Sequence, residues 1–303
     1  MSKGLLREQP APLSQTGVVL CADDFAMTNG ISRAIVELAD AGRISATSAM
    51  TNSAHWPSHA TWLARIRGQI AVGLHLNLTL GSPLGPMPNI APNRQFPALS
   101  AIAFSALAGT VNRAELRAEI ERQVQAFESE LGFPPDHIDG HQHVHALPVI
   151  RTVLLDVLKQ RYRANQVRPL LRDPSDNVLT VLKRGRARRK TLALVAMSKG
   201  FRAAAKSAGF SCNEGFGGVT DFSANQVGVD FAAVNIASGP RQMVMCHPGF
   251  VDDELTRLDP VTGRRQREFD ALMRGDFAAP LWRPRRTAGG GCIVWSEEWT
   301  GAK

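Results

Sequence analysis

The sequence predicts a mostly parallel α/β fold, and three observations support this prediction. Short apolar segments rich in β-branched residues alternate with amphipathic segments along the chain, as in folds whose parallel strands are joined by crossover helices. The 303 residues are 44% hydrophobic and 20% charged, which suits a globular protein with a sizeable core. The unusual polar residues follow the apolar segments, and parallel folds gather polar groups at the carboxyl ends of their strands.

The first strand and the first helix are expected near the N-terminus. Gly17–Phe25 (GVVLCADDF) is an apolar run that ends in carboxylates, as a buried strand with a polar C-terminal end does. The next segment has a cap at Thr28, apolar residues at helical spacing and Gly42 as a stop signal. We therefore predict a strand and then a helix, with Asp23 and Asp24 at the junction.

The remaining elements continue this alternation. The clearest helix is 112–132, where Asn112 is the cap, Gly132 ends the helix and apolar residues recur on one face. Another helix is entered at Pro148. Strands are predicted at 43–50, 69–80, 241–249 and 291–295.

Polar side chains end four predicted strands that are far apart in sequence. They are Asp23–Asp24, His75, the cluster HIDGHQHVH at 137–145, and His247. A barrel or an open parallel sheet brings all four onto one face. A carboxylate with two imidazoles is a common ligand set for a divalent cation that keeps positions open for water and substrate. A second carboxylate can then act as a base and a distant histidine as an acid, which indicates a water-activating hydrolase.

Four motifs carry a resemblance to a known family. ADDF, GLHLNLTLGSPL, HIDGHQHVH and MCHPG occur in the order and spacing of the YdjC-like carbohydrate deacetylases, so the chain resembles that family from Val18 to Leu272. The resemblance implies a distorted (β/α) barrel with fewer strands than the full eight. It also implies a metal-dependent hydrolase that removes an acetyl group from an N-acetylated saccharide of the chitooligosaccharide type. We expect a single catalytic domain at 18–303 after an N-terminal extension at 1–17.

The resemblance also implies roles for particular residues. Asp24, His75 and His141 match the ligands of one divalent ion, with magnesium expected first and zinc, manganese or cobalt permitted by the same donors. Asp23 matches the adjacent base, which takes a proton from the activated water. His247 matches the histidine near the leaving group, where a cationic imidazole can protonate the departing amine.

The histidine cluster offers more donors than one ion can use. If residues 139–145 are extended, the alternate side chains from Asp139 to His145 all point to one face. We expect Asp139 or His145 to orient a ligand imidazole without binding the ion. Asn77 is expected either to contact the substrate or to make a hydrogen bond at the strand end. A structural role is expected for His143, and surface or capping positions for His55, His59 and His137.

The chain departs from the family pattern in two places. The family usually has glycine where this chain has Ala26, a change that affects the turn after the aspartate pair and keeps both carboxylates. Of the net charge of +8, most belongs to the segment 168–206, where eleven Lys or Arg face only Asp173 and Asp176. This basic segment matches no motif. We interpret it as a solvated helix face or an insertion, and expect it not to be catalytic.

Two rival functions stay open at this point. The same site could act on a glycolipid or on a phosphoester, although a phosphatase often has two metals and more basic residues around them. The basic segment could instead bind nucleic acid, but it has almost no aromatic residues for base stacking. We therefore expect a small saccharide as the partner and disfavour nucleic acid.

Composition sets the expected surroundings of the protein. The four cysteines form no C-x-x-C pair, which excludes a zinc ribbon. The N-terminus has no apolar signal region, and no apolar stretch approaches the length of about 18 residues that a membrane span needs. We expect a cytoplasmic protein with reduced thiols. A homodimer is the default expectation for its oligomeric state.

Overall fold

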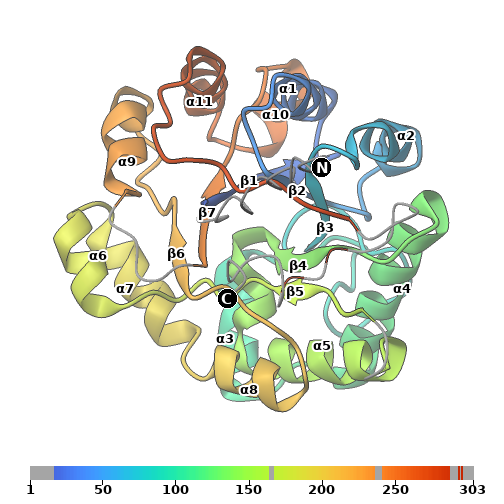
Figure 1. Ribbon diagram of the computed structural model, residues 1–303. Coiled ribbons are helices and arrows are strands. Elements are labelled where there is room, and N and C mark those ends of the chain that lie inside the picture. Colours follow the sequence, from blue (N-terminus) through green and yellow to red (C-terminus); the bar gives the residue numbers. More distant parts are fainter. Residues whose placement is uncertain (1–16, 164–166, 236–240, 287–292, 294, 296–303) are drawn as a thin grey trace, which may run out of the picture.

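The fold is one curled, parallel sheet surrounded by helices, seen in a computed structural model (Figure 1). The structure describes residues 17–163, 167–235, 241–286, 293 and 295. Within these residues the sheet has seven strands in the order β5-β4-β3-β2-β1-β7-β6. Their bounds are β1 Val19–Phe25, β2 Ala46–Ala49, β3 Ala71–Leu76, β4 His137–Gly140, β5 Leu170–Leu171, β6 Gly215–Gly217 and β7 Gln242–Cys246.

The two edges of the sheet approach each other, so the sheet curls into a barrel-like shape. All six pairs of adjacent strands are parallel. At one edge, Leu171 of β5 makes a parallel bridge to Cys212, just before β6 at the other edge. The amide of Leu171 also donates to the carbonyl of Ser211 at 2.9 Å. The prediction of a distorted (β/α) barrel with fewer than eight strands is therefore confirmed.

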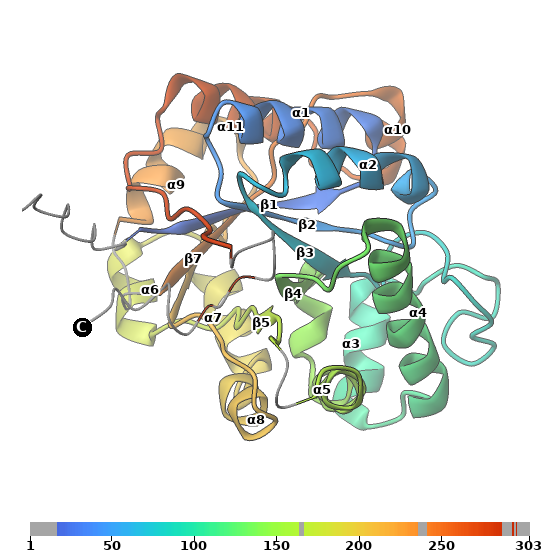
Figure 2. The same cartoon turned by 45° about the vertical axis from the view of Figure 1, so that its right-hand side comes forward.

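The helices lie around the outside of the strands (Figures 1 and 2). In the part of the chain that is described, none is both long and apolar enough to cross a bilayer. Two 3-10 turns, η1 His141–Ala146 and η2 Ala224–Gln226, lie in loops. The helices are α1 Asn29–Asp40, α2 Trp56–Ile66, α3 Leu99–Ala108, α4 Arg113–Leu131, α5 Pro148–Arg161, α6 Val178–Arg184, α7 Arg188–Met197, α8 Phe201–Ser207, α9 Val227–Ala233, α10 Asp253–Leu258 and α11 Gly263–Arg274.

The helix boundaries follow the signals in the sequence. Thr28 caps α1, because its hydroxyl accepts a hydrogen bond from the amide of Ile31 at 3.3 Å. Asn112 caps α4 by accepting from the first free amides of that helix. Gly132 ends α4 in the left-handed conformation, with φ 75°, which glycine adopts without steric cost. These predicted elements are confirmed.

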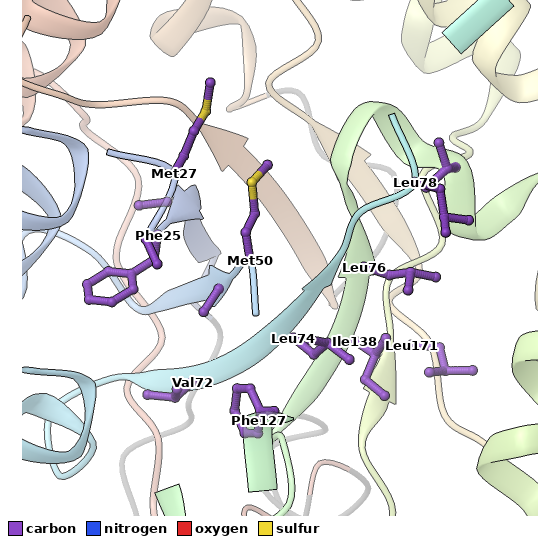
Figure 3. Packing of buried hydrophobic residues seen from close by; sticks show 14 of the residues in the cluster. Phe25, Met27, Met50, Val72, Leu74, Leu76, Leu78, Phe127, Ile138 and Leu171 are labelled. Atoms are coloured by element: carbon purple, nitrogen blue, oxygen red, sulfur yellow. The ribbon is translucent and has the colours of Figure 1, made fainter. Parts of the chain in front are cut away.

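Residues on the two faces of the sheet belong to two main apolar clusters. Leu74, Ile138 and Leu171, from three neighbouring strands, lie side by side in the larger core, between the sheet and the helices (Figure 3). A smaller cluster lines the other, concave face and includes Val19 and Cys21 of β1. Trp282 and Trp295 stack in that cluster with ring centroids 4.9 Å apart. The barrel interior is thus apolar at the N-terminal end of the strands, which leaves the C-terminal end for polar groups.

The histidine cluster is not extended along its whole length, so the condition for one shared face is not met. The chain is extended only through Gly140 and then turns into η1, so the side chains from Asp139 to His145 do not share one face. Gln142 and His143 adopt left-handed backbone conformations, with φ 51° and 60°. Neither residue type signals such a turn as glycine does, and so the sequence pattern did not predict it.

The basic segment 168–206 is part of the barrel wall. It begins with β5, a strand of the sheet, and continues through α6, α7 and most of α8. The N-terminal extension lies outside the described residues, apart from Gly17. The strand predicted at 291–295 also lies outside them, except for Ile293 and Trp295. The described cysteines, Cys21, Cys212 and Cys246, are free and buried.

Candidate active site

The polar strand ends meet at the C-terminal end of the barrel, as the sequence predicted. Asp23 and Asp24 end β1, His75 lies in β3, Asp139 lies in β4, and His141 follows β4 at the start of η1. Two sets of three donors each have their ligand atoms within 4.8 Å of one another: Asp24 with His75 and His141, and Asp23 with His75 and Asp139. The parallel sheet therefore brings together side chains that are more than a hundred positions apart in sequence.

The adjacent aspartates face different partners because the backbone turns between them. Asp24 has a left-handed backbone with φ 69°, and Ala26 has the same φ two residues later. The turn is held by the amide of Ala26, which donates to Ser32 Oγ at 2.9 Å. An L-residue pays about 1–2 kcal/mol in this conformation, whereas glycine does not. The geometry therefore gives a physical reason why a glycine suits the position of Ala26.

Asp24, His75 and His141 form the set that suits a metal ion. His141 Nδ1 lies 3.0 Å from Asp24 Oδ1, and His75 Nε2 lies 3.3 Å from the same oxygen. One carboxylate and two imidazoles match the donor preferences of a divalent ion, and three protein donors leave positions open for water and substrate. The residues present thus fit a catalytic ion rather than a closed structural site.

Asp139 orients His75 from behind. His75 Nδ1 donates to Asp139 Oδ1 at 2.6 Å and lies 3.0 Å from Ser48 Oγ, so its Nε2 faces Asp24. This is the carboxylate–histidine arrangement that fixes a metal-binding imidazole. Burial disfavours the imidazolium, but the Asp139 carboxylate, helped by Asp24 and Asp23, raises the pKa of His75 to about 10. An ion that binds Nε2 must therefore displace a proton.

Arg172 is a site residue that the sequence analysis missed. Its guanidinium is fully buried and donates to both oxygens of Asp23, at 2.6 and 2.7 Å. It also forms an ion pair with Asp139. Burial opposes the charge on Asp139, but Arg172 and His75 hold the pKa of this carboxyl well below its usual value. Arg172 belongs to the basic segment and directly follows β5, the strand next to β4, which carries Asp139. The basic segment therefore contributes one side chain to the site.

Arg265 is a second missed residue, and it binds the other aspartate. This α11 side chain donates to Asp24 Oδ2 at 2.7 Å and to Asp259 Oδ2 at 2.6 Å. Burial raises the pKa of Asp24, but Arg265 and the two histidines outweigh it and hold that pKa well below its usual range. Asp24 is thus a fixed carboxylate whose Oδ1 remains on the side of the imidazoles. Nothing in the surface-like sequence of α11 signals this contact.

His247 lies at the end of β7 and is half-buried. Its backbone amide donates to Glu268 Oε2 at 2.6 Å, and its ring makes an edge contact with Phe222, with centroids 5.5 Å apart. Burial lowers the pKa of His247, although Asp24 and Asp23 act in the opposite direction. Burial thus favours the neutral ring in the free protein.

The structure separates the residues that were expected to assist the ligands. Asp139 orients His75, whereas His145 Nε2 donates to the carbonyl of Arg172 at 2.8 Å and supports the backbone there. Burial lowers the pKa of His145 to about 4, so it is neutral. The amide of Asn77 binds the backbone of Thr79 and Leu80, which favours the strand-end hydrogen bonds over contact with the substrate.

The expected surface positions are wrong for two histidines. His137 is fully buried inside the barrel, where Nε2 lies 3.6 Å from Cys21 Sγ. Gly73 makes room for this ring, since a Cβ there would come within 2.4 Å of it. His59 is also buried, whereas His55 takes the capping position of α2. His143 packs edge-on against Phe216, in keeping with a structural role, and burial holds its pKa well below the usual value.

Comparison with known proteins shows relatives of one kind. The family profile described as YdjC-like protein matches residues 17–282. A chitooligosaccharide deacetylase of Klebsiella pneumoniae (strain 342) is 29% identical over 239 residues, which cover 78% of this chain and 83% of that protein. A human carbohydrate deacetylase is 37% identical over 147 residues, which cover 47% of this chain and 45% of that protein. The match to the human protein thus spans less than half of its length.

A solved structure supports the fold. A candidate cellobiose-phosphate cleavage protein from Enterococcus faecalis V583 superposes with a TM-score of 0.63, over 86% of this chain and 91% of that one. The two sequences are 21% identical. At this identity, the likeness concerns the arrangement of strands and helices alone.

Proposed function

This chain belongs to the YdjC-like family, and on that premise we propose that it is a metal-dependent hydrolase that removes the acetyl group from an N-acetylated saccharide. The observation that carries the proposal is the convergence of Asp24, His75 and His141, with the ion pair of Asp23 and Arg172 beside them. The relatives named as chitooligosaccharide and carbohydrate deacetylases support this substrate class.

We assign the metal ligands to Asp24, His75 and His141. When bound there, one divalent ion would polarise the acetamide carbonyl and lower the pKa of a water. We propose magnesium first, as the family resemblance implies, and the same oxygen and nitrogen donors admit zinc, manganese or cobalt. Asp139 would hold His75 with Nε2 toward the ion, because its carboxylate keeps the hydrogen on Nδ1.

We assign the base to Asp23. Arg172 holds both of its oxygens, so that the carboxylate is fixed in one orientation. Asp23 forms one set of close donors with His75 and Asp139, but it does not belong to the set of Asp24, His75 and His141. It therefore lies beside the ion-binding set and can accept a proton from water there. Because Asp23 is buried and held in place, the proton can pass from the water to its carboxylate over a short distance.

We assign proton delivery to His247. Hydrolysis breaks the amide C–N bond, releases acetate and leaves the sugar amine, whose nitrogen must gain a proton. His247 lies beside Asp23, because β1 and β7 are adjacent and Ala22 pairs with Cys246, the residue before His247. Because burial keeps the ring neutral at rest, the proton that it gives to the nitrogen must be gained within the same turnover.

The rival functions have less support in the structure. Phosphoryl transfer favours cationic side chains that are free to hold the phosphate. Of the described residues nearest Asp23 and Asp24, Arg172 and Arg265 are both committed to buried carboxylates. In the basic segment, several cations are also paired, which weakens the case for nucleic acid. These pairs are Arg184 with Asp176, Arg186 with Asp230 and Arg202 with Asp173.

Other parts of the proposal follow from the sequence. We keep a single catalytic domain at 18–303, a cytoplasmic location and a homodimer as proposals. The defining experiment measures acetate release from a panel of N-acetylated sugars, after the protein is stripped and reloaded with each divalent ion. We expect release that depends on the ion and favours chitooligosaccharides. Release of phosphate from matched phosphoesters, without acetate release, would overturn the proposal.

A further inference from the structure

The loop at 218–223, after β6, presents an aromatic ring to the site. Phe222 in this loop is half-buried and makes the edge contact with His247 at 5.5 Å. Its backbone is left-handed, with φ 60°. For a bulky side chain this conformation is an outlier, and such strained residues persist only where the surrounding structure holds them. Phe222 is therefore placed by its neighbours and not by its own backbone preference.

Three hydrogen bonds hold the loop on either side of Phe222. Its amide donates to Thr220 Oγ1 at 3.2 Å. Lys190, from the first turn of α7, donates to the carbonyl of Thr220 at 3.2 Å. Arg264 donates to the carbonyl of Ser223 at 2.8 Å. The Lys190 ammonium also lies 4.8 Å from the centroid of the Phe222 ring, within the range of a cation–π contact. The basic segment thus reaches the rim of the site through Lys190.

One ion pair anchors the backbone next to Phe222 and the backbone of His247. Arg264 Nε donates to Glu268 Oε1 at 2.6 Å, and the other oxygen of Glu268 accepts from the amide of His247. The strained loop and the end of β7 are therefore held by one buried pair. The backbone that carries the Phe222 ring is thus anchored to the strand end that carries the imidazole we assign to the departing nitrogen.

We propose that Phe222 is a specificity-determining residue whose ring forms the wall against which a pyranose ring of the substrate packs, beside His247. The inference rests on the proposed function. Binding sites for small ligands combine apolar and aromatic walls with a few placed polar groups. A sugar offers a C–H face to such a wall while its hydroxyls meet polar groups. Phe222 is the aromatic residue that touches His247 among the described ring contacts.

The test compares two Phe222 variants on two substrates. Phe222→Asn removes the ring, and asparagine tolerates the left-handed backbone, so the loop can keep its shape. Phe222→Tyr keeps the ring. Each metal-loaded variant is assayed on a chitooligosaccharide and on p-nitrophenyl acetate, an activated ester with no sugar. Binding of the chitooligosaccharide is also measured by calorimetry, which does not depend on turnover.

For Phe222→Asn we expect KM and Kd for the chitooligosaccharide to rise by roughly tenfold, the scale of losing one buried aromatic contact. Hydrolysis of p-nitrophenyl acetate should not change, and Phe222→Tyr should behave as the wild type. Phe250→Asn is the matched control. Phe250 is also half-buried, with Arg33 over its ring and an edge contact to Phe269, but it does not touch His247 in the described contacts.

The outcomes separate this inference from the proposed function. Unchanged KM and Kd in Phe222→Asn overturn the inference. A loss of kcat on the saccharide with KM and Kd unchanged would make Phe222 only a support for His247, because the leaving group of p-nitrophenyl acetate needs no proton. Wild-type protein that binds the saccharide but releases no acetate overturns the proposed function, while the difference in Kd still decides the role of Phe222. Wild-type protein that does not bind the saccharide overturns both.

Discussion

Arg172 and Asp23, 149 positions apart in sequence, form a two-point ion pair that is buried within the C-terminal end of the barrel. Arg172 also pairs with Asp139, which in turn orients His75. One guanidinium thus connects the proposed base with the carboxylate behind a proposed metal ligand. This connection makes the geometry of the site depend on the closure of the sheet at β5.

Removing this guanidinium should destabilise the fold. Arg172→Met keeps much of the volume but leaves Asp23 and Asp139 buried without their cation, and breaking a buried pair from one side costs about 3–5 kcal/mol. Arg188→Met, on an exposed side chain of the same basic segment, should change stability by less than about 0.5 kcal/mol. Urea unfolding of both variants measures the difference. If Arg172→Met and Arg188→Met have the same free energy of unfolding, the buried ion pair of Arg172 does not stabilise the fold.

Removing the proposed base should separate turnover from metal binding. Asp23→Asn keeps the size of the side chain and removes its basicity, so turnover should fall by roughly 10²–10⁴-fold. Affinity for the ion should hold, because Asp24, His75 and His141 are unchanged. Acetate release and calorimetric titration with the ion are compared in the same preparation. Loss of the ion in this variant would place Asp23 among the ligands.

Metal binding should release a proton at a pH where an ordinary histidine is already neutral. His75 in the ion-free protein has its pKa raised to about 10, so its proton is displaced by the ion and affinity should rise by about tenfold per pH unit toward that value. The same raised pKa contributes stability to the ion-free fold below the unfolded value of about 6.5, and this contribution is lost as pH rises through about 10.

Calorimetry at pH 8, in two buffers that differ in ionisation enthalpy, counts the protons released per ion. We expect the wild type to release about one proton per ion bound. Asp139→Asn should release fewer, because it lacks the carboxylate that raises the pKa of His75. Zero protons in the wild type would contradict the arrangement of His75 between two carboxylates.

The strained turn after the aspartate pair predicts an unusual response to glycine. Ala26→Gly relieves a left-handed conformation that costs about 1–2 kcal/mol, which offsets the loss of a buried methyl and the added chain entropy. The free energy of unfolding of Ala26→Gly should therefore differ from that of the wild type by less than about 1 kcal/mol. Ala34→Gly, equally buried but inside α1, gains no relief and should cost about 2 kcal/mol. Thermal and urea unfolding compare the stabilities of the two variants. If both lose the same free energy of unfolding, the backbone at Ala26 is not strained.

Charge reversal on the exposed face of the basic segment should leave turnover nearly unchanged. Arg188 and Arg189 are exposed, and charges in solvent are screened over about 8 Å at physiological salt. Arg188→Glu with Arg189→Glu should therefore keep kcat on a small neutral sugar within about twofold of the wild type. Lys190 is left intact, because it contacts Phe222. A collapse in kcat with the fold intact would extend the site to this face.

Local patterns predicted the elements and most of the strand-end groups. Asp23, Asp24, His75 and His247 follow apolar strand segments, and a parallel fold places such positions at one end. The sequence could not predict their cationic partners. Arg265 pairs with Asp24 across 241 positions, and this contact depends on how the barrel closes and where α11 packs. The turn at His143 was also missed, since its positive φ is set by the surroundings and not by the residue type.

The central claim, that Asp24, His75 and His141 hold the ion of a saccharide deacetylase, is tested most directly by one titration. Stripped protein receives increasing amounts of a divalent ion while acetate release from an N-acetylated chitooligosaccharide is recorded, for the wild type and for His141→Ala. The account predicts no release without the ion, a rise that saturates at one equivalent in the wild type, and no comparable rise in His141→Ala. Full release by the stripped protein, or an unchanged titration in His141→Ala, would contradict it.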